Sequence, residues 1–327
     1  MGVSVSRVQH EDFGERWAVV HGDEFALLPD QYPTHRELLD DYRERPERFE
    51  AVALPRVPAG ETQLRAPISA DVQIFCQGLN YASHREEGGA SRTAAAKKGQ
   101  NLIFSKPPSS ICGPRDAIVR PRGCELLDYE VELGLVMRRD IAPHANITEA
   151  NLLDYVGGIT LANDVSARDF MFGAPMLQWF KGKGQRTFCP LGPTLYLLGE
   201  GDDDLLNHLR LTLALNGEIR QDATTDLLIH KPAETLTELA GFTDVRRGDL
   251  LLTGTPGGVI LNATPKVGLA ILINFTNDER RRRKLIKSLR GVRFLQPGDK
   301  LRLTLTSRDG TLDLGHQAST IVDAGST

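Results

Sequence analysis

Two glutamates lie close together in the apolar stretch LLDYEVELGLV (Leu126–Val136). The apolar residues around Glu130 and Glu132 predict a buried strand. Side chains two residues apart in a strand point to the same face, so the two carboxylates are expected to lie together. Repulsion and desolvation then favour protonation of at least one of them, unless a divalent cation such as Mg²⁺ removes that cost. A solvent-exposed strand face is the alternative interpretation, and Glu-x-Glu alone does not exclude it.

A third acid favours the metal interpretation. The stretch TLANDVSARD places Asp164 at the end of an apolar strand, beside a loop of small residues. A carboxylate in that position is able to meet carboxylates from another strand. Three acids with open water positions form a site for a hard cation and for substrate oxygens.

A histidine and a glutamate lie three residues apart in GLNYASHREEGG. If this stretch forms a helical turn, His84 and Glu87 share a face, and Glu87 holds the imidazole as a general base. A surface histidine in a charged helix is the alternative. Gly88 and Gly89 follow directly and are typical of a segment that moves, as a lid does.

Two further stretches place polar groups beside glycines. Lys181 and Lys183 lie in KGKG, and a lysine on a constrained glycine loop stabilises a developing enolate or carboxylate. The turn TGTPGGV follows an apolar strand, and its backbone N–H groups and the Thr255 hydroxyl are suited to binding a carboxylate. It lacks the Gly-Lys-Ser/Thr ending of a P-loop. For both stretches, ordinary surface residues are the alternative.

The sequence predicts that mostly β-strands position these candidate residues. Residues 1–65 predict a small N-terminal domain, with a hairpin turning at Gly22 and a helix over residues 33–52 capped by Thr34. Residues 66–327 are dominated by strand patterns, including a hairpin at Asn216-Gly217. The sequence therefore predicts a β-rich α+β fold with a rolled or sandwiched sheet.

Composition excludes several classes of protein. The 327 residues are 40% hydrophobic and 25% charged, with a formal net charge of −4. This charge gives no general attraction to nucleic acid or to an anionic membrane. The longest late apolar run, residues 267–275, is too short to span a bilayer. The four cysteines form no C-x-x-C pair and predict reduced thiols in a cytoplasmic protein.

A basic segment, NDERRRRKLIKSLRG, covers residues 277–291. Its charge order predicts a short solvated helix capped by Asn277, with Leu285, Ile286 and Leu289 as an apolar stripe. A patch for phosphate or nucleic acid is the alternative. No aromatic residue is interleaved, so we predict no nucleic-acid partner.

The candidate residues lie in stretches that follow one another in a fixed order: GLNYASHREE, LDYEVELGLV, ANDVSARD, KGKGQRTFCPLGP, LNGEIRQ and LLTGTPGGV. As an ordered set they resemble the fumarylacetoacetate hydrolase superfamily, over residues 67–259 and again from residue 294. The resemblance implies a mixed β-roll, a small N-terminal domain, a homodimer and a Mg²⁺ or Mn²⁺ ion. The roles it implies are metal ligands (Glu130, Glu132, Asp164), a catalytic dyad with a nearby lysine (His84, Glu87, Lys183) and substrate binding (Arg168, Thr255).

The sequence departs from the family pattern at three positions. Arg186 stands where most relatives have an acid, which leaves specificity and oligomer contacts open. Gln77 and Met171 stand where the larger hydrolases have an acid and a glutamine, which favours the smaller acylpyruvate-hydrolase-like group. The segment around residues 260–293 is longer than usual and is interpreted as an insertion.

The resemblance implies an enzyme acting on a small 2-oxo acid. The leading hypothesis is a hydrolase that cleaves a C–C bond of a 2,4-dioxo acid, an acylpyruvate such as fumarylpyruvate, through a metal-bound enolate. His84 takes a proton from water in this scheme. The alternative is an isomerase or decarboxylase of a 2-oxo or 2-hydroxymuconate-type diacid in aromatic catabolism.

Overall fold

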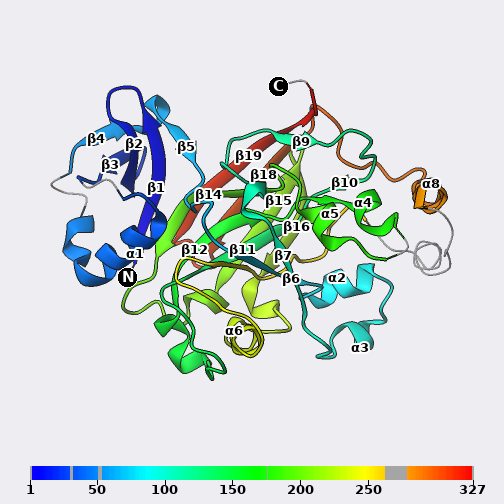
Figure 1. The fold of residues 1–327 in the computed structure, drawn as a ribbon. Helices are drawn as coiled ribbons and strands as arrows, with labels where there is room; N and C mark the ends of the chain where they lie inside the picture. Colours follow the sequence, from blue (N-terminus) through cyan, green and yellow to red (C-terminus); the bar gives the residue numbers. More distant parts are fainter. Residues whose placement is uncertain (1, 30–31, 51–53, 175, 262–277, 326–327) are drawn as a thin grey trace.

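The computed structural model describes residues 2–29, 32–50, 54–174, 176–261 and 278–325. Strands dominate these residues, and short helices lie around them (Figure 1). The predicted β-rich α+β fold is therefore confirmed. The two large sheets share one apolar core, in which Leu133 and Leu161 of one sheet cluster with Leu211 and Leu303 of the other.

The longer sheet carries the site. Its central strands are buried along their whole length: β11 (Val131–Met137), β12 (Val156–Asn163), β14 (Cys189–Leu197) and β17 (Leu250–Leu252). Strands buried on both faces need mostly apolar residues, and this explains the largely apolar runs in the sequence. In sheet order the strands are β4 (Arg56–Pro58), β3 (Glu24–Leu27), β2 (Gly14–His21), β1 (Val3–His10), β14 (Cys189–Leu197), β12 (Val156–Asn163), β11 (Val131–Met137), β17 (Leu250–Leu252), β6 (Ile74–Gly78) and β7 (Leu102–Lys106), with β5 (Gln63–Arg65) on β1 and β8 (Ile111–Cys112) on β14.

The second sheet alternates buried and exposed side chains, as expected for a sheet with one face in the core. The predicted hairpin at Asn216-Gly217 is confirmed, since Leu215 pairs with Glu218 across that turn. A small ladder joins β10 (Leu127–Asp128) to β13 (Ser166–Ala167). The order of the second sheet is β16 (Glu218–Thr224), β15 (Leu209–Leu215), β18 (Lys300–Ser307), β19 (Asp313–Asp323) and β9 (Ile118–Arg120).

The first helix is shorter than its sequence pattern predicts. Thr34 caps α1 with a capping box, as predicted, but the helix ends at Glu44 instead of continuing to residue 52. Pro46 cannot continue an α-helix, and a 3₁₀ turn follows over Pro46–Phe49. The described helices are α1 (His35–Glu44), α2 (Ala82–Glu87), α3 (Arg92–Ala95), α4 (Arg168–Phe172), α5 (Trp179–Lys183), α6 (Pro232–Ala240) and α8 (Asp278–Ser288).

The N-terminal strands extend the main sheet. β1 pairs with β14 from Val3 to Ser6, so hydrogen bonding is continuous between the first strands and the core (Figure 1). His35 of α1 makes a second connection, because its Nε2 donates to the carbonyl of Gly248 at 2.9 Å and its Nδ1 accepts from the N–H of Ser69 at 3.1 Å. The division at residue 65 stays a prediction.

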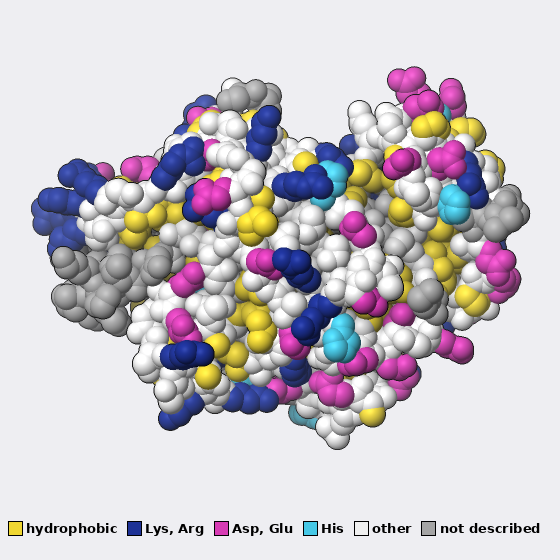
Figure 2. Space-filling model, turned by 180° about the vertical axis from the view of Figure 1, so that it is seen from behind, with side chains coloured by type: hydrophobic (Ala, Val, Ile, Leu, Met, Phe, Trp, Pro, Cys, Tyr) yellow, Lys and Arg dark blue, Asp and Glu magenta, His cyan; other side chains and the backbone are white. Residues whose placement is uncertain are grey.

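The basic segment forms α8, as predicted. Its Leu285 and Leu289 are buried against Leu126 and Phe294. Figure 2 shows Lys and Arg side chains gathered at the edge of the molecule where α8 lies, and charges of both signs over the rest of that face. The proposed Asn277 cap and the apolar run 267–275 lie outside the described residues. Within the described chain, no helix has the length and apolar character needed to cross a membrane.

Candidate metal and active site

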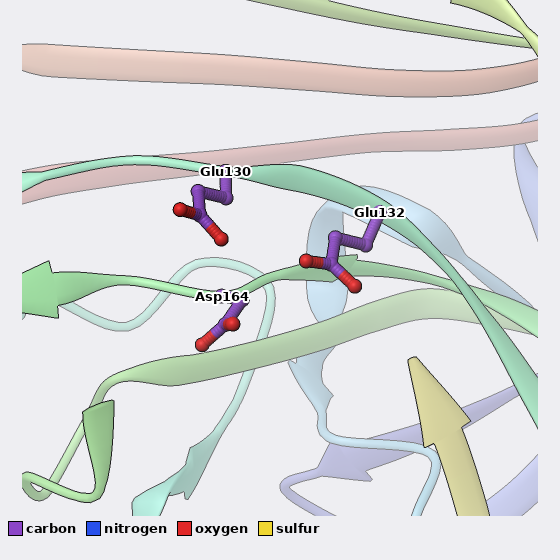
Figure 3. A group of neighbouring side chains, drawn as sticks. All are labelled: Glu130, Glu132 and Asp164. Atoms are coloured by element: carbon purple, nitrogen blue, oxygen red, sulfur yellow. The ribbon is translucent and has the colours of Figure 1, made fainter. Parts of the chain in front are cut away.

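Three carboxylates meet where β11 begins and β12 ends. These strands are antiparallel, and Val131 lies opposite Asn163. The pairing brings Glu130 and Glu132 beside Asp164, which follows β12 directly. One oxygen from each carboxylate lies within 4.8 Å of the others, and all three side chains are buried. Figure 3 shows the three carboxylates turned toward a common space.

Buried cations surround these acids. The Lys183 ammonium donates to Glu130 Oε2 and to Asp164 Oδ2, both at 2.5 Å. Lys106, the last residue of β7, donates to Asp164 Oδ1 at 2.6 Å. The Arg168 guanidinium joins Asp128 at 2.9 Å to Glu130 Oε1 at 2.6 Å. The arrangement is a connected charge network.

The pKa values of Glu130 and Glu132 are shifted in opposite directions. Burial alone raises the pKa of Glu130, but the neighbouring Lys183 and Arg168 outweigh it and lower that pKa to about 2. Burial raises the pKa of Glu132 well above its usual value, and the negative charges of Asp164 and Glu130 raise it further. Among the described residues, Glu132 is the carboxylate of the three that makes no direct ion pair with a lysine or arginine.

The residues present fit a divalent metal. Glu132 Oε2 accepts the Gly254 N–H at 2.8 Å, whereas its buried Oε1 has no hydrogen-bond partner among the residues that the structure describes. An unpaired buried carboxylate oxygen is costly. Three carboxylates are the donor set of a hard cation such as Mg²⁺ or Mn²⁺. Glu130, Glu132 and Asp164 would hold that ion.

The glycine-rich turn after β17 binds carboxylates of the protein itself. Gly254 donates to Glu132, and Gly258 donates to Glu87 Oε1 at 2.6 Å. The Thr255 hydroxyl donates to the carbonyl of Val131 at 3.0 Å and accepts from Gln221 at 2.8 Å. Thr255 thus joins this turn to the strand that carries Glu132, and its predicted role in substrate binding stays a prediction.

The predicted dyad lies on α2. Glu87 Oε2 is 3.4 Å from His84 Nδ1, and the same carboxylate is fixed through its other oxygen by Gly258. A carboxylate on Nδ1 leaves Nε2 of the imidazole for proton transfer. Glu87 therefore positions His84 against the turn that also holds Glu132.

A cavity of about 320 Å³ is lined by several of the candidate site residues. His84, Glu130, Arg168 and Lys183 all line it. Its volume is at the small end of the range of about 300–1,000 Å³ that is typical of small-molecule sites. Gln77 and Met171, two of the positions that depart from the larger hydrolases, also line this cavity.

The structure brings together the predicted residues and adds two that the sequence reasoning missed. Lys183 ends the helix α5 instead of lying in a loop, and it is buried. Lys106 and Asp128 were missed. The signals were a lysine inside the apolar strand LIFSK and the spacing Asp128-x-Glu130-x-Glu132, which places three acids on alternate residues. Arg186 is exposed.

The fold and site define a β-rich protein with a buried carboxylate centre. A model of the fumarylacetoacetate (FAA) hydrolase C-terminal family matches residues 73–322, and the chain belongs to this family. It is 36% identical to the mitochondrial oxaloacetate tautomerase FAHD2A of Bos taurus over 219 residues, which are 67% of each chain.

Two solved structures share the fold over nearly the whole chain. A probable 2-hydroxyhepta-2,4-diene-1,7-dioate isomerase from Mycobacterium abscessus is 27% identical, with a TM-score of 0.72 and coverage of 99% of both chains. A maleylpyruvate hydrolase from Sphingobium sp. SYK-6, in complex with manganese(II) and pyruvate, is 22% identical, with a TM-score of 0.68 and coverage of 99% of this chain and 100% of that chain. The second likeness supports the fold alone. The family thus includes hydrolases, isomerases and tautomerases.

Proposed function

We propose that this protein is a divalent-metal-dependent hydrolase that cleaves a C–C bond of an acylpyruvate. The observation that carries the proposal is the buried carboxylate triad beside a cavity that also contains His84 and Lys183. The bound ion, Mg²⁺ or Mn²⁺, would supply ligand positions for the oxygens of a 2-oxo acid and stabilise negative charge on them.

The charges of the cluster suit an anionic substrate. Four acids (Asp128, Glu130, Glu132, Asp164) face three cations (Lys106, Arg168, Lys183), which leaves one negative charge. A divalent ion would change that sum to one positive charge. A substrate carboxylate then neutralises the site.

The chain's own residues account for the proton transfers. His84, held by Glu87, takes a proton from water, and the resulting hydroxide adds to the distal C4 carbonyl. The C3–C4 bond breaks, and its electron pair leaves on the pyruvate side as an enolate. Protonation at C3 gives pyruvate. One acylpyruvate and one water thus give pyruvate, a carboxylate and one proton. Lys183 is placed to stabilise the enolate charge.

A second candidate is isomerisation or tautomerisation of a 2-oxo diacid. It is supported by the oxaloacetate tautomerase and the diene-dioate isomerase among the similar proteins. The same base would move a proton between carbon atoms of an enolate, and no C–C bond would break. Decarboxylation of such a diacid is a further variant of this chemistry.

One substrate screen separates these candidates. The purified protein with Mg²⁺ or Mn²⁺ is incubated with acylpyruvates, hydroxymuconate-type diacids and oxaloacetate, and the products are followed by mass spectrometry. Hydrolysis adds the mass of water and releases pyruvate, isomerisation leaves the mass unchanged, and decarboxylation releases CO₂. Glu130→Ala is the control and should remove the metal-dependent reaction. A product of unchanged mass from every substrate would contradict the hydrolase proposal.

We also propose a homodimer, as the family resemblance implies. Sedimentation velocity at several protein concentrations tests it. A monomer at all concentrations would contradict this part of the proposal.

A further inference from the structure

The cavity has two chemically different ends. Its ionisable side chains gather at the carboxylate centre, where Arg168 and Lys183 contact Glu130. His84, held by Glu87 on α2, lines the same cavity as Glu130. The remaining side chains of the wall are largely apolar: Leu79, Leu102, Met171, Phe172, Leu177, Trp179 and Leu261.

The apolar wall is joined to the charged end by aromatic contacts. The Trp179 ring lies 5.0 Å from the Phe104 ring, centroid to centroid, and the Lys183 ammonium lies 5.2 Å from the Phe104 centroid. Trp179 also lies over Gly78, where an added Cβ would come within 3.6 Å of the indole. The indole is therefore held in the wall by its contacts with Phe104 and Gly78.

Leu79 occupies the wall at a conformational cost. Its φ is +52°, a left-handed conformation that is unfavourable for a non-glycine residue. The Arg85 guanidinium holds this conformation by donating to the Leu79 carbonyl at 2.6 Å. A strained residue at a candidate site is a reason to look for a function, and here the strained backbone carries an apolar side chain of the wall.

The described wall offers no cation to a second carboxylate. Arg168 is bound to Asp128 and Glu130, and Lys183 is bound to Glu130 and Asp164. A charged group at the distal end of a substrate would lose its hydration against leucine and tryptophan side chains and gain no partner among the described lining residues. An alkyl or aryl group would gain free energy there.

We propose that the enzyme selects acylpyruvates whose acyl group is uncharged and apolar, in preference to diacids such as fumarylpyruvate. The inference rests on the proposed function for its reaction and on the apolar wall for its specificity. Leu102 and Leu177, which are 36% and 47% exposed, form the open end of the wall, so the acyl chain extends toward solvent.

Kinetics with a substrate series test the preference. With Mg²⁺, kcat/KM is measured for acetylpyruvate, butanoylpyruvate, hexanoylpyruvate and fumarylpyruvate. Burying a methylene favours binding by about fourfold, so kcat/KM should rise by up to about that factor for each methylene until the wall is covered. Fumarylpyruvate should be at least about tenfold poorer than butanoylpyruvate. An equal or better rate with fumarylpyruvate would overturn the inference.

Binding to Trp179 separates this inference from the proposed reaction. The chain has two tryptophans, and Trp17 is buried in β2, in the N-terminal layer. A Trp17→Phe variant therefore reports on Trp179 alone. Its fluorescence should respond to 2-oxooctanoate at a concentration at least about tenfold lower than to 2-oxoglutarate. This result would support the apolar wall even if no acylpyruvate were cleaved, whereas tighter binding of 2-oxoglutarate would overturn it even if hydrolysis were found.

A charge placed in the wall should reverse the preference. Leu177→Arg should raise KM for hexanoylpyruvate about tenfold and lower KM for fumarylpyruvate. Phe242→Arg is the matched control, because Phe242 is 65% exposed and lies outside the residues that line the cavity. If Leu177→Arg changed the sedimentation of the protein and left the substrate preference unaltered, the wall would be a contact between copies, and the inference would be wrong.

Discussion

Two buried carboxylates in this molecule have opposite surroundings. Asp169 of α4 accepts N–H groups from Glu125 at 3.1 Å and Leu126 at 3.4 Å, and the Arg282 guanidinium at 2.7 Å. Glu132 is equally inaccessible, but within the described part of the chain it accepts one N–H and leaves Oε1 without a partner. A carboxylate that serves folding is satisfied by the chain itself. One that is left unsatisfied lowers stability, and it is retained where a ligand completes it.

The largest effect should follow from Glu132→Gln. Removing this charge should reduce metal-dependent activity at least about a hundredfold. Without metal the variant should be at least as stable as the wild type, because repulsion from Glu130 and Asp164 is relieved. Activity and thermal unfolding are measured in EDTA and in Mg²⁺. Mg²⁺ should stabilise the wild type and leave the variant unchanged. Equal stabilisation of both proteins would mean that the ion binds elsewhere.

Asp169→Asn should act on stability instead. Neutralising a fully buried, paired carboxylate costs about 3–5 kcal/mol of unfolding free energy, because the amide keeps only one acceptor oxygen and places an NH₂ group among N–H donors. Urea unfolding measures this loss. Asp222→Asn is the matched control. Asp222 pairs with Arg210 at the surface, where such pairs contribute less than about 1 kcal/mol. Equal losses of unfolding free energy in the two variants would contradict a folding role for Asp169. If Asp169→Asn lost the stabilisation by Mg²⁺, Asp169 would serve the metal site as Glu132 does.

The sequence predicted the carboxylate centre because its geometry is local to strands. Alternation places Glu130 and Glu132 on one face, and the end of an apolar strand identifies Asp164. Lys106 could not be placed in the same way, because its contact with Asp164 spans 58 residues along the chain. In the order of the sheet, β11, β17 and β6 lie between β12 and β7, so the contact depends on the three-dimensional course of the whole sheet, which no residue spacing encodes.

The glycine-rich turn shows a second limit of sequence reasoning. Its composition predicts backbone N–H groups suited to a carboxylate, and that chemistry is present. The acceptors are Glu132 and Glu87 of the chain itself, which lie 122 and 171 residues away from their donors. The length of α1 was also overpredicted, since the periodicity over residues 33–52 continues past Pro46 whereas the helix does not. Local patterns thus gave the type of interaction, and the tertiary fold determined the partners.

His35 extends the comparison of buried groups to a side chain whose charge changes at a pH where unfolding can be measured. Burial lowers the pKa of His35 to about 4, whereas an unfolded histidine titrates near pH 6.5. The unfolded state binds the proton between these values and the folded state does not. This contribution to stability is complete above about pH 6.5 and decreases by about 3 kcal/mol as the pH falls to 4.

A His35→Gln variant isolates that contribution. The difference in unfolding free energy between the wild type and the variant is measured by urea unfolding at pH 7.5 and pH 4.5. The wild type should lose its advantage at the lower pH, because only its unfolded chain gains a proton at this position. A difference that stays constant with pH would show that His35 is protonated in the folded protein or is exposed to solvent.

The smallest effect should come from the outer face of α8. Arg283 pairs with Glu279 four residues earlier, and both side chains are more than two-thirds exposed. Arg283→Ala should change the unfolding free energy by less than about 0.5 kcal/mol, because solvent screens such pairs. Arg282→Ala is the matched variant one position earlier. It removes the partner of Asp169 and should cost at least about 1.5 kcal/mol. Equal effects would mean that the arginine run acts as a solvated surface, and that Asp169 is satisfied by the backbone N–H groups alone.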